Sequence, residues 1–291
     1  MDAGSGIGFE LAAGTVIGLD HVRRGATFIG GNNQDAHSVI ISSRLGLAIG
    51  VVCDGCGSHA RSELGAAFTA SLVADEVLRS LLHRGDRWAM IEEWVLGDLR
   101  DLAGLYRRAN PSEFLFSTIV GFLILEEEDT TTIFHIGDGY FGVNHQLTQL
   151  ESPIENTPPY LAYQILSPND EANELFRAGL GDRPYSFQTA TWRTQDVTSV
   201  FVATDGLRHL IGNVGEPLPT MPSQRVPSVD EILSMDDIFL NPFRLGNLLN
   251  AINAEGLRVE DGRARRVPGF LLDDTTMVIA RRRPPEDGGI I

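Results

Sequence analysis

Short apolar runs alternate along the chain with longer stretches of helical periodicity. The runs combine β-branched, aromatic and small residues and end in Gly, Asp, Asn or polar positions, a pattern typical of buried strands. The predicted strands are residues 38–42, 47–53, 117–125, 130–136, 140–144, 197–203 and 275–280. Short polar breaks between neighbouring strands indicate hairpin connections, with residues 117–144 forming a meander.

Helical periodicity covers residues 61–83, where the predicted apolar face consists of Leu64, Ala67, Ser71, Ala74, Leu78 and Leu81. A second helix runs from Trp88 to about Tyr106 and a third covers residues 242–254. The two tryptophans of the second helix, Trp88 and Trp94, have helical spacing and are interpreted as packing residues. Two consecutive helices beside hairpin-connected strands favour an α+β layered domain over a parallel βαβ fold.

The remaining segments carry weaker signals. The first 20 residues are predicted to be either a frayed lead-in or an edge strand. The proline-containing stretch 151–187 is either a substrate-facing flap or a cover for a sheet edge. The arginine-rich run 263–266 is a solvated loop or a site that recruits a phosphorylated partner. Residues 18–36 are predicted to be loop and short strands, and residues 212–228, 260–268 and 284–291 to be loops or polar segments.

The composition fits an ordinary globular protein, with 291 residues, 43% hydrophobic content and a net charge of −16. No repeat or linker is evident, so we expect one domain over residues 1–291, with a core at about 18–282. The negative charge argues against nucleic acid or an anionic membrane as a partner. No run reaches the roughly 20 apolar residues of a membrane span.

Both cysteines of the chain, Cys53 and Cys56, lie in one C-x-x-C spacing. A structural zinc site would need a second ligand pair, and Cys53 belongs to a predicted buried strand, so zinc or redox use is disfavoured. So few cysteines fit a reducing compartment, and we expect a cytoplasmic protein.

Carboxylates recur at the ends of the predicted strands. They are Asp35, Asp54, Asp138, Asp205 and the pair Asp273-Asp274. Each one alone is explained by a turn, since Asp-Gly is a favoured turn dipeptide. If these strand ends meet, however, the cluster needs a divalent cation to neutralise it, and all-oxygen ligands favour Mg²⁺ or Mn²⁺.

Five short motifs extend this pattern. They are residues 33–36 (NQDA), 52–59 (VCDGCGSH), 135–138 (HIGD), 203–207 (ATDGL) and 273–276 (DDTT). In order and spacing they resemble the metal-dependent serine/threonine phosphatases of the protein phosphatase 2C type, bacterial subgroup. The resemblance implies a four-layer α-β-β-α sandwich, in which a central antiparallel β-sandwich is flanked by helices.

The resemblance also implies two Mn²⁺ or Mg²⁺ ions, with a third in some members, and a bridging hydroxide that attacks phosphorus. Asp54, Asp205 and Asp273 would be the catalytic carboxylates. The metal ligands carried over by position are Asp35 (through water), Asp54, the Gly55 carbonyl, Asp138 (third ion), Asp205 and Asp273. A one-residue misregister at the closing motif would exchange Asp273 for Asp274.

The sequence departs from the family pattern in the opening motifs. The arginine that grips the substrate phosphate in many members is replaced by Gly30, and the nearby His21 and Arg24 are candidates to supply that charge. Gln34 replaces the usual glutamate, which is expected to weaken the second metal. Cys56 takes the place of a histidine that bacterial relatives also lack.

The resemblance therefore implies a phosphatase acting in signalling on phosphoserine and phosphothreonine of proteins, the products of a serine/threonine kinase. We expect a monomer. The alternative is a catalytically inactive, phosphatase-like regulatory module that binds phosphoproteins or other partners. Retention of Asp54, Asp205 and Asp273 favours the enzyme.

Overall fold

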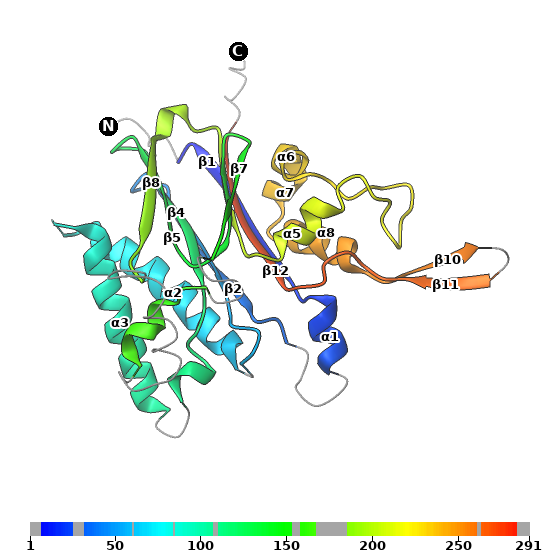
Figure 1. Cartoon of the computed structure of the whole chain (residues 1–291). Helices are drawn as coiled ribbons and strands as arrows, with labels where there is room; N and C mark the ends of the chain where they lie inside the picture. The colour runs from blue at the N-terminus through cyan, green and yellow to red at the C-terminus, as the bar shows by residue number, and fades with distance from the viewer. Residues whose placement is uncertain are drawn as a thin grey trace, which may run out of the picture.

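Two five-stranded antiparallel sheets lie face to face in the centre of the molecule (Figure 1). The computed structural model describes residues 7–25, 32–59, 61–83, 85–106, 110–152, 158–166, 185–260 and 263–283. The first sheet has the order β1 (Phe9–Val16), β12 (Thr275–Arg282), β9 (Ser199–Ala203), β6 (Gly139–Val143) and β7 (Gln146–Leu150). The second has the order β2 (Asp35–Ser42), β3 (Leu47–Asp54), β4 (Ile119–Leu125), β5 (Thr130–Ile136) and β8 (Gln188–Arg193).

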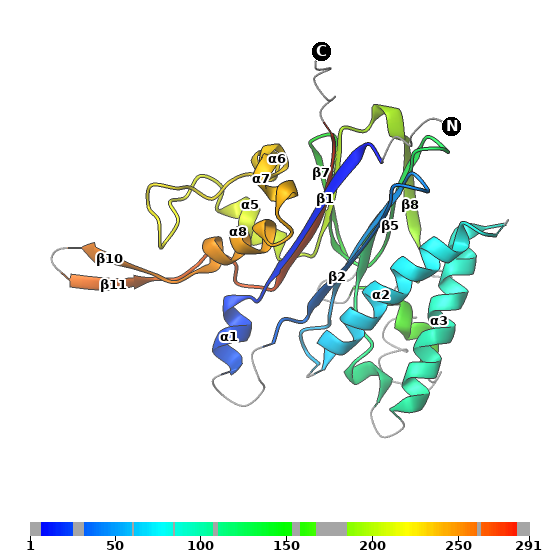
Figure 2. The ribbon, with the colours of Figure 1, turned by 180° about the vertical axis from the view of Figure 1, so that it is seen from behind.

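Helices cover the outer faces of both sheets (Figures 1 and 2). The second sheet is covered by α2 (Ser62–Ser80) and α3 (Arg87–Leu105). The first is covered by α5 (Leu207–Gly212), α6 (Val229–Ser234), α7 (Asp236–Leu240) and α8 (Arg244–Asn253). Short 3-10 turns are η1 (Pro111–Glu113), η2 (Leu161–Ile165) and η3 (Thr194–Asp196). The predicted α-β-β-α sandwich is confirmed; the one-domain boundaries stay a prediction.

Three layers of apolar side chains hold the four layers together. Between the two sheets lie residues such as Phe9, Phe122 and Val278. Strand β3 shows why its sequence is apolar throughout: Ala48 and Val52 face the other sheet, whereas Leu47, Ile49, Val51 and Cys53 face the helices. A strand buried on both faces cannot alternate with polar residues.

Helix α2 packs largely through small residues, and its predicted face is only partly correct. Ala74 is buried and Leu78 and Leu81 pack against the core, but the other three predicted positions face solvent. Leu64 is 37% exposed, and Ala67 and Ser71 are exposed as well. The buried side consists of Ser62, Gly65, Ala66, Thr69, Ala70, Val73, Ala74, Glu76, Val77 and Ser80. The approach is close, since a Cβ on Gly65 would lie 1.9 Å from the Phe114 carbonyl oxygen, and close approach requires small side chains.

Other elements also differ from the sequence predictions. The N-terminal stretch forms the edge strand β1, one of the two alternatives, and a short helix α1 (Leu19–Gly25) replaces a predicted loop. Strand β6 does not continue the meander, because the chain crosses to the other sheet after β5. The basic loop is instead a hairpin, β10 (Gly256–Glu260) and β11 (Arg263–Val267), which projects from the body (Figure 1). Backbone pairing between β10 and β11 therefore forms strands despite their polar composition.

Edge strands β7 and β8 were not predicted because their residues are mostly polar and exposed. The predicted tail, residues 284–291, lies outside the described residues, as does most of the excursion between η2 and β8. Within the described part of the chain, no helix combines the length and the apolar content required to cross a membrane.

Replacement of Phe122 tests the layer between the sheets. Phe122→Ala is expected to lower the free energy of unfolding by about 3–5 kcal/mol, because it empties a fully buried aromatic site. The matched control is Phe243→Ala, at a side chain 73% exposed, with an expected change below about 0.5 kcal/mol. Urea denaturation measures both. Equal losses in the two variants would contradict this packing.

Candidate functional site

The sandwich brings the predicted carboxylates to one end. Asp35 begins β2 and is the register partner of Asp54 at the end of β3. Asp205 follows β9, and Asp273 and Asp274 precede its neighbour β12. Because β9 and β12 are antiparallel, the end of one and the start of the other share an edge, and the Thr204 amide donates to the Thr276 carbonyl at 3.0 Å.

Asp138 joins this cluster through the crossing between the sheets. It lies between Gly137 and Gly139, which have φ values of 101° and 135°. Such values favour glycine and allow the abrupt change of direction from β5 to β6. Tyr140 pairs with Ala203, so the turn is placed beside the end of β9. The crossing therefore positions Asp138 next to Asp205.

Gly55 is confined on several sides. Its amide donates to the Gln34 carbonyl at 3.1 Å, and it forms an isolated bridge with Ser117. A Cβ at this position would lie 2.7 Å from the Gln34 carbonyl oxygen and 2.8 Å from that of Ser62. Close backbone approach therefore requires glycine, beyond the needs of an ordinary turn.

Burial and mutual repulsion raise the pKa values of four carboxyl groups. The pKa of Asp54 lies well above its usual range because of burial, followed by repulsion from Asp35, Asp205, Asp273 and Asp138. The pKa of Asp35 is likewise raised, first by burial and then by Asp274. Burial and then Asp205 raise the pKa of Asp138 to about 6, and burial raises that of Asp205. Such a cluster favours a cation between its members.

Asp35 is held in place by its neighbours. The Thr204 hydroxyl donates to Asp35 Oδ2 at 2.7 Å, and the same hydroxyl accepts from the Thr276 amide at 3.0 Å. The Asp35 amide donates to Asn33 Oδ1 at 3.0 Å. These bonds connect the opening motif with two strands of the other sheet and fix the orientation of the carboxylate.

The two closing aspartates have different surroundings. Asp274 is buried and accepts hydrogen bonds from the amides of Gly18 (2.7 Å) and Gln34 (2.6 Å). Asp273 is 36% exposed at its side chain and lies on the Asp205 side of the cluster. Asp274 is thus bonded to backbone amides on the Asp35 side of the cluster, whereas Asp273 is more exposed and lies on the Asp205 side.

His21 lies beside these aspartates. Its Nδ1 is 2.8 Å from Asp274 Oδ2 and its Nε2 is 4.0 Å from Asp273 Oδ1. The structure thus gives His21 a role in holding the closing motif, and its predicted contact with substrate phosphate stays a prediction. Arg24 belongs to α1, and its side chain is outside the described residues.

The sequence did not predict the contacts that two further side chains, Arg208 and Gln34, make at the site. Arg208 of α5 donates to Asp205 Oδ2 at 2.6 Å and to Asp273 Oδ2 at 2.9 Å. Gln34 donates from Nε2 to the His59 carbonyl, while its buried Oε1 has no hydrogen-bond partner within the described chain. Arg208 lies three residues after Asp205, at a junction between strand and helix. This spacing could have indicated its contact with Asp205.

The donor set fits a hard divalent cation. No group of three or more His, Cys, Asp or Glu side chains in the described ranges is arranged as a ready-made metal site. The chemistry nevertheless matches, since the cluster offers carboxylates that repel one another and Gln34 Oε1 is a buried oxygen that no donor satisfies. The types of side chain at this end of the sandwich are therefore compatible with a divalent cation.

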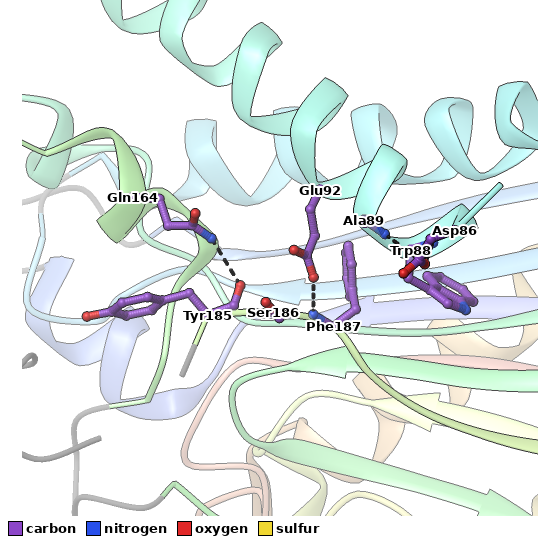
Figure 3. Close-up of a pocket in the computed structure, with 8 residues that line it drawn as sticks. All are labelled: Asp86, Trp88, Ala89, Glu92, Gln164, Tyr185, Ser186 and Phe187. Carbon is purple, nitrogen blue, oxygen red and sulfur yellow. Dashed lines mark hydrogen bonds between the residues drawn. The ribbon is translucent and has the colours of Figure 1, made fainter. Parts of the chain in front are cut away.

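A separate cavity of about 570 Å³ lies between the start of α3 and the segment leading into β8 (Figure 3). Its polar groups already serve the fold. Asp86 caps α3 through the amides of Trp88 and Ala89, and Glu92 accepts from the Phe187 amide. Trp88 packs on Phe134 with ring centroids 4.9 Å apart, confirming the predicted packing role. This cavity does not include the carboxylate cluster.

A family comparison gives the class of the protein. The family described as Protein phosphatase 2C matches residues 17–235. The match covers most of the chain and agrees with the four-layer fold, and the chain belongs to the protein phosphatase 2C family. No curated protein sequence matches the chain.

Solved structures agree on the fold. A sex-determining protein of C. elegans is similar with a TM-score of 0.54 and 16% identity, over 97% of this chain and 66% of that chain. A substituted form of a bacterial serine phosphatase is similar with a TM-score of 0.50 and 17% identity, over 94% and 99%. A chain from work on the bacterial stressosome gives 0.50 and 13%, over 94% and 99%.

The raised carboxyl pKa values predict how stability depends on pH without metal. A folded protein whose carboxyl groups bind protons more tightly than the unfolded chain loses stability as pH rises through the folded pKa values. In EDTA we expect a lower melting temperature at pH 8 than at pH 5.5, a window that contains the pKa of about 6 for Asp138. Thermal unfolding of the wild type and Asp54→Asn measures this. A drop that is equally steep in Asp54→Asn would contradict the cluster.

Proposed function

We propose that this protein hydrolyses phosphoserine and phosphothreonine in proteins with the help of two Mn²⁺ or Mg²⁺ ions. The observation that carries the proposal is the meeting of Asp35, Asp54, Asp138, Asp205 and Asp273 at one end of the sandwich. These residues come from both sheets, and their mutual repulsion supports a role in holding cations. Family membership supports the reaction class.

The residues divide into two groups around Asp54. On one side Asp205 and Asp273 would complete the first metal site with Asp54. On the other, Asp54 and the Gly55 carbonyl would hold the second ion, with Gln34 Oε1 as a neutral oxygen donor nearby. Asp138, beside Asp205, would hold a third ion.

When bound, the ions would supply an activated water and positive charge at the phosphoryl group. The chain's own residues orient the reactants. Asp35, whose carboxylate is fixed by the Thr204 hydroxyl, would accept a hydrogen bond from a water molecule at the metal site and hold it in place. Asp274 and His21 hold the loop that carries Asp273. His21 and Arg24 are the proposed contacts to substrate phosphate.

A second candidate is an inactive module that binds phosphoproteins or a regulatory partner. Two observations favour it: the neutral Gln34 stands where the family has an acid, and Arg208 already neutralises Asp205 and Asp273. A monomeric, cytoplasmic protein remains our expectation under both candidates.

Loss of the central aspartates tests the enzyme. Asp54→Ala and Asp205→Ala are each expected to lower Mn²⁺-dependent turnover of a phosphothreonine peptide and of p-nitrophenyl phosphate by about 100-fold or more, because each removes a proposed ligand. Circular dichroism should show an intact fold, and Asp237→Ala, at an exposed ion pair on α7, is the control that should retain activity.

Two results would contradict the proposed enzyme activity or its metal centre. Wild-type protein that hydrolyses neither substrate with Mn²⁺ would favour the inactive module. Near-normal activity in Asp54→Ala or Asp205→Ala would show that the metal centre is misplaced.

A further inference from the structure

Arg208 contacts two proposed ligands of one ion. One guanidinium nitrogen is 2.6 Å from Asp205 Oδ2 and another is 2.9 Å from Asp273 Oδ2. Asp205 is three residues from Arg208 in sequence and Asp273 is 65 residues from it, so the guanidinium bridges carboxylates of two distant segments. Bridging two carboxylates with one cation is also what the first metal would do.

Electrostatics explains why the guanidinium lies there. Repulsion from Asp273 raises the pKa of Asp205, after the larger effect of burial, whereas Arg208 lowers it. Arg208 thus relieves part of the repulsion within the cluster. Planar guanidinium groups suit this role, since they offer several donors to carboxylates in fixed directions.

The bridge is reversible. The Arg208 side chain is 49% exposed and extends from the first turn of α5, so it can leave the carboxylates by rotating about its own bonds into solvent. Exposed charge pairs contribute little net free energy, because water and salt compete for both partners. A divalent cation can therefore displace the guanidinium.

We propose that Arg208 is an internal counter-ion that occupies the Asp205–Asp273 pair in the metal-free protein and that metal must displace. The inference rests on the proposed function, since it assigns these aspartates to the first ion. A guanidinium and a metal cannot share the same oxygen lone pairs at close range without mutual repulsion. Arg208 consequently lowers the affinity of this chain for its metal.

Direct binding of Mn²⁺ tests the proposal without reference to turnover. Isothermal titration calorimetry and the electron paramagnetic resonance signal of free Mn²⁺ measure the dissociation constant of the tightest site. Arg208→Gln is expected to tighten it by about twofold to fivefold, the range set by a charge pair that is partly exposed to water. Arg208→Lys, which keeps the charge but loses the fork of donors, should lie between Gln and the wild type.

The matched control is Arg244→Gln. Arg244 is also 49% exposed and pairs with a single aspartate, Asp237, away from the cluster. It should leave Mn²⁺ affinity unchanged. Thermal unfolding gives a second measurement: in EDTA Arg208→Gln should melt below the wild type, and the rise in melting temperature caused by Mn²⁺ should be larger in the variant.

The outcomes separate the two proposals. Unchanged Mn²⁺ affinity in Arg208→Gln would overturn the counter-ion role while leaving the metal centre intact. Weaker affinity would overturn it as well and would show that Arg208 orients the ligands. Wild-type protein that binds no Mn²⁺ would overturn the proposed function itself, and this inference with it.

Discussion

Repulsion among buried carboxylates is the constraint on which the site depends. Asp35, Asp54, Asp138 and Asp205 all have raised pKa values because burial removes water and because each faces other acids. A fold that brings such groups together loses stability unless a cation compensates. The core must therefore supply enough stabilisation to hold the strand ends in place. Three apolar layers, one between the sheets and one beneath each helical layer, provide it.

The same end of the sandwich shows how the cluster is kept in order. Asp274 is the carboxylate whose charge is satisfied by backbone amides and His21, so it belongs to the architecture. Asp273, one residue earlier, is left to face Asp205. Two neighbouring acids thus have different surroundings, because Asp274 is buried beside Asp35 and the backbone amides whereas Asp273 is partly exposed beside Asp205. This difference supports the proposal that Asp273, and not Asp274, is the ligand in the closing motif.

The buried strands and the positions of the carboxylates were predictable from the sequence, but their convergence in space was not. The apolar run of β3 and its abrupt end at Asp54 indicated a buried strand with a carboxylate at its mouth, and the motif order implied the sandwich. The convergence of the strand ends was not available from spacing, because it depends on pairing between β9 and β12 and on the crossing before β6.

Contacts between distant side chains were also beyond the sequence. Nothing local indicated that Arg208 reaches Asp273. The face of α2 was only partly predicted, because close approach to the chain at Phe114 selects small residues that helical periodicity alone does not identify. The hairpin of β10 and β11 carried a usable signal in Asp261-Gly262, a favoured turn dipeptide between two alternating runs, which its polar composition obscured.

The central claim is that these aspartates hold divalent ions. The most direct measurement is anomalous scattering at the manganese edge from crystals grown with Mn²⁺. The account predicts two strong peaks on either side of the Asp54 carboxylate, one contacted by Asp205 and Asp273 and the other by the Gly55 carbonyl. Crystals grown in excess Mn²⁺ that show no peak within coordination distance of Asp54 would contradict it.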